Sequence, residues 1–170
     1  MRILILAVVA CVTAGLAAQA LAAQRDTLSG FQNFRFGMNE QELRELVEIG
    51  EKRIRDNETE LIPTERTIID GTAYKLDFLL KENKLYYIGL LAEIKDPLTC
   101  VRRLERIFGL VKAKYGDPDD DPEYKNDRIS ETKSVSFTFQ DGARIVISTL
   151  KLSSCLEMIS YYAGSSGGTF

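Results

Sequence analysis

Two cysteines constrain the fold of this chain more than any other feature, because a bond between them would tie together two distant segments. The chain has three cysteines, Cys11, Cys100 and Cys155. Disulfides form and persist in oxidising compartments and are rare in the cytosol. A bond between Cys100 and Cys155 is therefore expected only if the chain is exported, which the N-terminal sequence can indicate.

The N-terminal segment has the three regions of a secretory signal peptide in their usual order. Arg2 precedes an apolar run over residues 3–12, and the segment closes on the A-x-A pattern at residues 20–22. A membrane-spanning helix is the alternative, but it needs about 20 apolar residues, and Gln19 and Gln24 interrupt the run. We predict a signal peptide over residues 1–22 and a mature chain that is periplasmic or secreted, without a membrane span.

The same segment allows a second interpretation, a lipid anchor. Residues 8–11 resemble a bacterial lipobox, in which Cys11 would become the lipidated first residue. Such a signal would be unusually short, so we favour cleavage after residue 22. Cys100 and Cys155 then remain in an oxidising compartment, where pairing is expected. Two free buried thiols are the alternative.

The mature chain predicts one domain of mildly acidic charge. Removing residues 1–22 takes away Arg2 and leaves 21 basic and 25 acidic residues, so the net charge is 21 − 25 = −4. We expect a domain over 24–163, with possible halves 31–94 and 95–163, and a disordered tail at 164–170. The lack of a basic tract disfavours nucleic acid and anionic lipid as partners.

Two helices are predicted. Asn39 and Glu42 form a capping-box pattern, so a helix starts near residue 40, and the polar run 55–60 ends it. Asp96 and Pro97 are a cap and a first helical residue, and Gly116 follows the end of this second helix. Cys100 falls on its first turn, on the side expected to face a sheet.

Strand patterns fill much of the rest. We predict strands at 66–70, 74–81, 85–94, 135–140, 144–152 and 155–162, with a hairpin turn at Asp141-Gly142. The fold class that follows is α+β, with two helices packed on a mostly antiparallel sheet. Residues 78–88 align without gaps on 137–147, which suggests a tandem α-β-β-β repeat. Two unrelated hairpins remain the alternative.

The string Phe36-Gly37-Met38-Asn39-Glu40-Gln41-Glu42-Leu43 resembles the helix start of the BamE/SmpA family of small bacterial envelope proteins. Those proteins share an α/β layout with the beta-lactamase inhibitor protein, a tandem of two such units. The resemblance implies a protein-binding module.

The chemistry of the side chains argues against common catalytic sites. The chain has no histidine, which removes Ser-His-Asp and Cys-His arrangements and the commonest metal ligand. The cysteines lack C-x-x-C spacing, so neither a redox motif nor a zinc site is indicated, and no cofactor is expected. Carboxylate pairs could still serve a hydrolase acting on envelope material.

The acidic loop Asp117 to Glu123 invites a calcium interpretation, because acidic residues alternate along it as in an EF-hand. Pro122 stands where that loop needs glycine, and Arg128 where it needs a bidentate glutamate. We therefore predict a solvated loop and no metal site.

Two tyrosine pairs, Tyr86-Tyr87 and Tyr161-Tyr162, are candidate binding residues. In each pair one ring should lie on either face of a strand, one in the core and one available to a partner. We expect a non-catalytic protein-binding module, inhibitor-like or scaffold-like, that uses the uncovered face of the sheet to hold another envelope protein. An envelope hydrolase and an immunity-type, toxin-neutralising protein are the alternatives.

Overall fold

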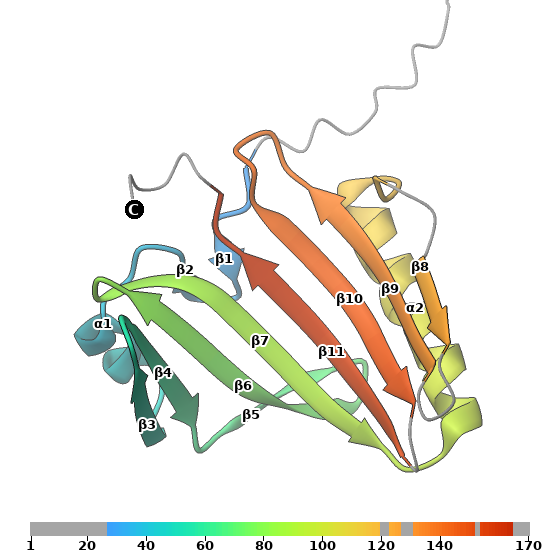
Figure 1. Cartoon of the computed structure of the whole chain (residues 1–170), viewed down its shortest axis with the longest axis horizontal. Helices are drawn as coiled ribbons and strands as arrows, with labels where there is room; N and C mark the ends of the chain where they lie inside the picture. The colour runs from blue at the N-terminus through green and yellow to red at the C-terminus, as the bar shows by residue number, and fades with distance from the viewer. Residues whose placement is uncertain (1–26, 120–122, 127–130, 152–153, 165–170) are drawn as a thin grey trace, which may run out of the picture.

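A computed structural model describes residues 27–119, 123–126, 131–151 and 154–164. The predicted signal peptide and residues 165–170 lie outside these ranges. Figure 1 shows a twisted sheet with its helices behind it. The sheet contains β3 (Ile49–Arg55), β4 (Glu58–Pro63), β5 (Arg66–Ile69), β6 (Thr72–Lys81), β7 (Lys84–Ile94), β8 (Glu123–Asn126), β9 (Glu131–Thr138), β10 (Arg144–Lys151) and β11 (Cys155–Tyr162).

The strands form two antiparallel meanders that share one sheet. The order is β3-β4-β6-β7-β11-β10-β9-β8, and β5 pairs with the first residues of β6. The first meander therefore meets the second where β7 pairs with β11. The predicted division near residue 95 falls between β7 and the helix α2 (Pro97–Tyr115), but the two halves are hydrogen-bonded into a single sheet.

The predicted α+β class is wrong, because the chain is mostly β. Of the two helices in the described ranges, only α2 packs along the sheet. The helix α1 (Glu40–Leu46) has 7 residues and ends before residue 49, whereas α2 has 19. The capping box of Asn39 and Glu42 is present as predicted. The following residues, Ile49–Arg55, form β3. Each half therefore contributes a four-stranded meander to the sheet order, where the α-β-β-β repeat predicted three strands.

The helix α2 packs against the second meander and is covalently attached to it. Asp96 caps the helix, with the backbone N–H of Thr99 donating to its carboxylate at 3.1 Å. Cys100, Leu104 and Ile107 are buried on one side of α2. A disulfide joins Cys100 to Cys155 at the start of β11, with their Cα atoms 6.2 Å apart, within the usual range. The predicted pairing is confirmed.

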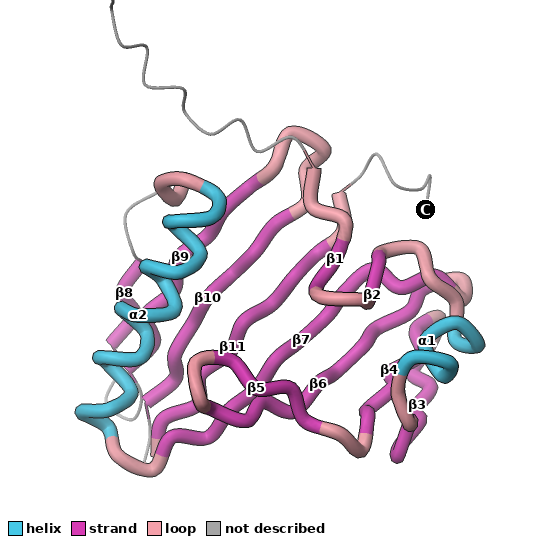
Figure 2. The backbone as a smooth tube through the Cα atoms, turned by 180° about the vertical axis from the view of Figure 1, so that it is seen from behind, coloured by secondary structure: helices cyan, strands magenta, loops and turns pink. Residues whose placement is uncertain are grey.

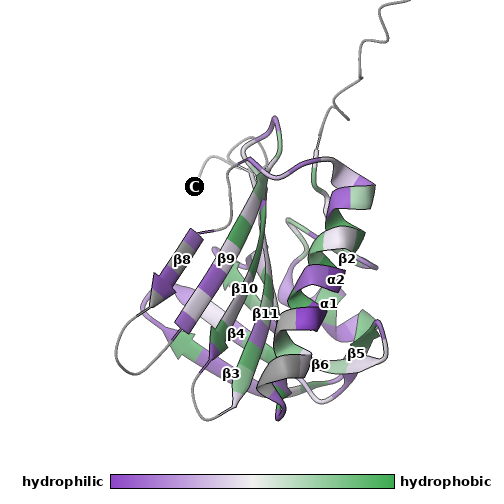
Figure 3. Ribbon diagram, turned by 90° about the vertical axis from the view of Figure 1, so that its right-hand side faces the viewer, coloured by the Kyte–Doolittle hydropathy of each residue, from purple (hydrophilic) through white to green (hydrophobic). Residues whose placement is uncertain are grey.

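The core lies on one face of the sheet. Figure 3 shows α2, α1 and the short hairpin of β1 (Gly30–Phe31) and β2 (Phe34–Arg35) on the same side of the sheet, and in Figure 2 this side faces the viewer. The ring of Phe34 in the hairpin packs against that of Phe78 in β6, with 4.7 Å between the ring centroids. The largest fully buried side chains are Tyr74, Phe78, Phe137, Leu43, Leu61, Leu80, Leu85, Ile88, Leu90, Ile107, Ile145 and Ile147. In the described ranges, no helix or strand covers the opposite face (Figure 3).

Candidate functional site

The uncovered face of the sheet carries many apolar side chains. Along an antiparallel strand, residues alternate between faces, and a face turned to water is usually polar. Here the register places Leu79, Tyr87 and Tyr162 side by side on β6, β7 and β11. The face also presents Leu91, which is 39% exposed. The remaining apolar side chains of this face are half-buried: Val146, Leu150, Leu156 and Met158.

A shallow hollow of about 360 Å³ lies at one end of this face. Strands β4, β6, β7 and β11 and the end of β3 contribute to it. We call it the tyrosine hollow, and it is lined by Arg55, Glu58, Glu60, Asp77, Leu79, Tyr86, Tyr87 and Tyr162.

A β-bulge brings two consecutive tyrosines into the hollow. The register between β6 and β7 shifts between Leu79 and Leu80, so Leu79 pairs with Tyr87 while Leu80 pairs with Leu85. Tyr86 is the extra residue, and a bulge of this kind lets neighbouring side chains share one face. The prediction that Tyr86 and Tyr87 lie on opposite faces is therefore wrong.

The ring of Tyr87 lies along the sheet because its neighbour Gly89 has no side chain. A Cβ atom on Gly89 would come within 2.7 Å of the Tyr87 hydroxyl oxygen. That hydroxyl is 3.2 Å from the hydroxyl of Ser160, and the Tyr87 ring centroid is 5.1 Å from that of Tyr162. The two rings therefore form one aromatic wall of the hollow.

The tyrosines of the second pair, Tyr161 and Tyr162, lie on opposite faces of the sheet, as predicted. Tyr161 is buried on the covered face, where its ring contacts Phe31 at 5.1 Å between centroids. Tyr162 is half-buried on the uncovered face, with the guanidinium of Arg144 5.3 Å from its ring centroid. Three of the four candidate tyrosines therefore lie at the tyrosine hollow. Their binding role stays a prediction.

Three carboxylates line the hollow, and they differ in their hydrogen-bonding partners. Tyr86 donates its hydroxyl proton to Glu58 at 2.8 Å. Glu60 accepts a longer contact from Arg53 at 3.4 Å. Asp77 differs, because its Oδ1 is buried and has no hydrogen-bond partner. Burial, followed by repulsion from Glu60, raises the pKa of Asp77 to about 6, which the guanidinium of Arg53 opposes.

Asp77 should make the stability of the protein depend on pH. A raised carboxyl pKa favours the protonated folded state, so its contribution is fully present below the usual pKa near 3.8 and is lost as pH rises through about 6. We expect Asp77→Asn to gain about 1 kcal/mol relative to wild type between pH 4 and pH 7.5, a value discounted for solvent screening. Urea unfolding at both pH values measures this.

The matched control is Glu93→Gln, an exposed carboxylate of β7 on the same face. This variant gives the effect of removing an exposed carboxylate from the same face, against which the effect of Asp77→Asn is compared. If the Asp77→Asn difference is the same at both pH values, the carboxyl of Asp77 has its ordinary acidity and the argument from burial is wrong.

A second group of charged residues lies on the covered face, between α2 and the sheet. Glu157 of β11 is fully buried and accepts a hydrogen bond from the hydroxyl of Tyr74. Arg103 of α2 donates to the same hydroxyl at 3.1 Å, and its Nε is 3.3 Å from Glu157 Oε2. Asp70 then pairs with Arg106 at 2.7 Å. This network is closed to solvent at Glu157 and links α2 to β6 and β11.

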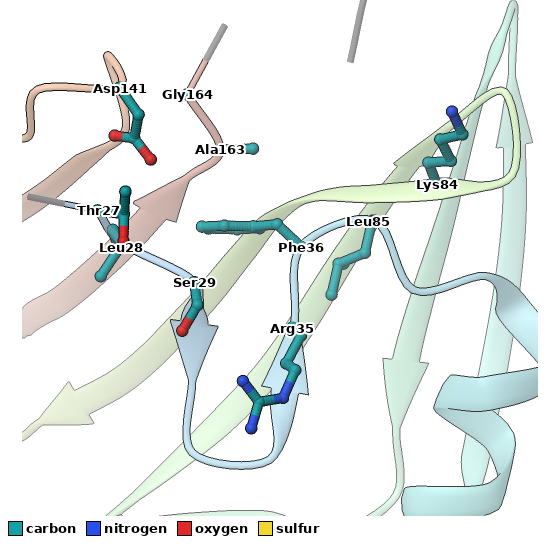
Figure 4. A pocket seen from close by; sticks show the side chains of 11 residues that line it. Thr27, Leu28, Ser29, Arg35, Phe36, Lys84, Leu85, Asp141, Ala163 and Gly164 are labelled. Atoms are coloured by element: carbon teal, nitrogen blue, oxygen red, sulfur yellow. The ribbon is translucent and has the colours of Figure 1, made fainter. Parts of the chain in front are cut away.

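Two further hollows lined by described residues differ from the tyrosine hollow. One lies between the N-terminal hairpin and the turn at Asp141, where Arg35 and Lys84 sit apart from that carboxylate (Figure 4). Another, of about 480 Å³, is a mostly apolar groove between α2, β5 and the hairpin, with the exposed side chains of Ile68 and Leu110 on its walls.

Two residues of the acidic loop form contacts with other parts of the protein. Asp117 pairs with Lys112, and Asp119 accepts a hydrogen bond from the backbone N–H of Thr138 at 2.5 Å. Residues 120–122 and Arg128 lie outside the described ranges. Over the residues that the structure does describe, no group of three or more Cys, Asp or Glu could hold a metal ion. No helix there is long and apolar enough to cross a membrane.

Gly164, the first residue of the predicted tail, is buried. A Cβ atom placed on it would lie 2.2 Å from the carbonyl oxygen of Asp141. Gly164 therefore packs closely against the turn at Asp141.

Comparisons of the chain with protein-family models, with curated proteins and with solved structures gave no match. The resemblance to the BamE/SmpA helix start therefore stays a prediction.

Proposed function

We propose that this chain is an exported protein-binding module of the bacterial periplasm, which holds a partner protein on the uncovered face of its sheet. The observation that carries the proposal is the aromatic and aliphatic composition of that face, with Leu79, Tyr87, Leu91 and Tyr162 turned away from the core. Contiguous apolar surface rimmed by polar groups is typical of interaction sites. Tyrosine is enriched among the residues that dominate binding energy.

The charge of this face indicates a protein partner. Glu58, Glu60, Asp77 and Glu93 lie on it or line its hollow, together with the basic residues Arg55, Lys75 and Arg144, so the face carries both signs of charge and no basic patch for an anionic lipid surface. A protein surface with basic and apolar side chains is complementary to this arrangement. Export itself rests on the signal peptide pattern, and the Cys100–Cys155 disulfide is consistent with an oxidising compartment.

Leu91 offers the sharpest test of this surface. The Leu91→Arg variant should bind the partner at least tenfold more weakly, because a charge would replace an apolar contact in the proposed interface. The matched control is Leu46→Arg on α1, since Leu46 is 44% exposed and Leu91 is 39% exposed. Quantitative affinity capture from an envelope extract compares wild type with both variants.

A protein that is captured by wild type and by Leu46→Arg, but lost with Leu91→Arg, supports the proposal, and its identity then separates a scaffold, an inhibited enzyme and a toxin. Equal capture by all three chains means that the sheet face is not the binding surface.

A hydrolase acting on envelope polysaccharide is the second candidate, and one observation favours it. Asp77 and Glu60 line the same hollow, and the raised pKa of Asp77 suits a proton donor paired with an ionised carboxylate. Cleavage of peptidoglycan oligosaccharides by wild type, abolished in Asp77→Asn, would establish this activity instead.

A further inference from the structure

The lining of the tyrosine hollow has an excess of negative groups. Three carboxylates, Glu58, Glu60 and Asp77, face one guanidinium, that of Arg55. The neighbouring Arg53 is bound by Glu51 at 2.7 Å, and it reaches Glu60 only at 3.4 Å. Because field strength rises where water is partly excluded, the hollow attracts a positive group from outside.

One hydrogen-bond acceptor in the hollow, the carboxylate oxygen Oδ1 of Asp77, has no donor. The hydroxyl of Tyr86 already donates to Glu58, and that of Tyr87 is paired with Ser160. The buried Oδ1 of Asp77 has no partner, and a buried acceptor left without a donor is costly. An ammonium or guanidinium group has hydrogen-bond donors and no acceptor. It can therefore donate to Asp77 without bringing an acceptor that would itself need a donor.

The aromatic wall of the hollow suits a cation as well. Ring faces attract ammonium and guanidinium groups within about 6 Å of the centroid. Tyr162 already has Arg144 at 5.3 Å, and the ring of Tyr87 lies 5.1 Å from Tyr162. The volume of about 360 Å³ lies near the lower end of ligand pockets, roughly 300–1,000 Å³, which suits a single side chain.

We infer that the tyrosine hollow receives one lysine or arginine side chain of the partner protein, held by Asp77 and the rings of Tyr87 and Tyr162. The inference rests on the proposed protein-binding function and specifies the chemistry of the partner. The basic side chain anchors the partner at one end of the sheet face, while Leu91 and its apolar neighbours contact the rest.

The test uses small analogues of the two side chains on the exported, disulfide-bonded chain. We expect n-butylammonium and ethylguanidinium to shift the NMR signals of Tyr87, Gly89 and Tyr162 with dissociation constants on the order of 1 mM at pH 7.5. Asp77→Asn should weaken both by about tenfold, because a charge-assisted hydrogen bond is lost. The control variant Glu45→Gln, which removes an exposed carboxylate of α1, should bind as wild type does.

Two neutral probes decide the alternatives. Equal shifts with n-butanol would show a merely apolar hollow, and binding of a neutral N-acetylglucosamine disaccharide in preference to the cations would indicate a sugar site; either result overturns the inference. Absence of shifts with the cations overturns it too. Failure of the wider function has a different signature, since capture would then be unaffected by Leu91→Arg whether or not the hollow binds cations.

Discussion

Replacing Arg103 by leucine is expected to lower the free energy of unfolding by about 3–5 kcal/mol, the usual cost of leaving one charge of a buried pair alone. Glu157 is fully buried, and its contacts are the hydroxyl of Tyr74 and the Nε of Arg103 at 3.3 Å. Without Arg103, the carboxylate has no positive partner, and Tyr74 loses the donor at 3.1 Å. Urea unfolding followed by circular dichroism at pH 7 measures the loss.

The matched control is Arg106→Leu, because Arg106 lies three residues after Arg103 on α2. Arg106 pairs with Asp70 at 2.7 Å, but its side chain is 69% exposed, so its removal should cost less than 1 kcal/mol, as for other surface pairs. Adding Glu157→Gln to Arg103→Leu should recover at least half of the lost stability, because the buried charge is then gone. Equal losses for Arg103→Leu and Arg106→Leu would show that Glu157 carries no unbalanced charge.

The elements that sequence alone predicted well are those with strong local signals. Asp96, Pro97 and Gly116 bracket α2, and its start and end were predicted from these residues. The turn at Asp141-Gly142 placed the hairpin of β9 and β10 in the same way. Because these signals depend on neighbours in the chain, they need no knowledge of the tertiary structure.

The hairpin of β3 and β4 was missed because its stability comes from pairing across strands. After Ile49, every residue of β3 is exposed, so no alternation of apolar and polar residues marks it as a strand. The available signal was a basic segment opposite an acidic one, as in the pair Arg53 and Glu60, around a turn at Asp56 with a φ of 49°. Leu43 and Val47 instead suggested a longer helix.

The candidate site was predicted only in part, for a similar reason. Alternation along β11 predicted that Tyr161 and Tyr162 lie on opposite faces, as they do, but the bulge beside Leu79 moved Tyr86 to the face of Tyr87. The burial of Asp77 depends on groups from other strands, which no local pattern reports. Glu157 shares the parity of Cys155 and Ile159, so its burial was predictable, whereas its partner on α2 was not.

Reducing the Cys100–Cys155 disulfide should cost about 4 kcal/mol of stability, since the bond closes a loop across a sequence separation of 55 residues. Both residues are buried, so the bond joins α2 to β11 inside the core. Urea unfolding with and without a reductant should show a lower midpoint for the reduced protein. The variant Cys100→Ala with Cys155→Ala should unfold alike in both conditions. If the wild type is also insensitive to reductant, its thiols are free.

The disulfide and the Arg103–Glu157 pair stabilise the same contact, and their effects should therefore not add. Cys100 lies about one helical turn before Arg103, and Cys155 lies two residues before Glu157 on the same face of β11. Reduction loosens the start of α2 and admits water to Glu157, which lowers the cost of losing Arg103. We expect reduced Arg103→Leu to be more stable than the sum of the separate losses predicts, by about 1 kcal/mol or more. A strictly additive double perturbation would show that α2 stays docked without the bond.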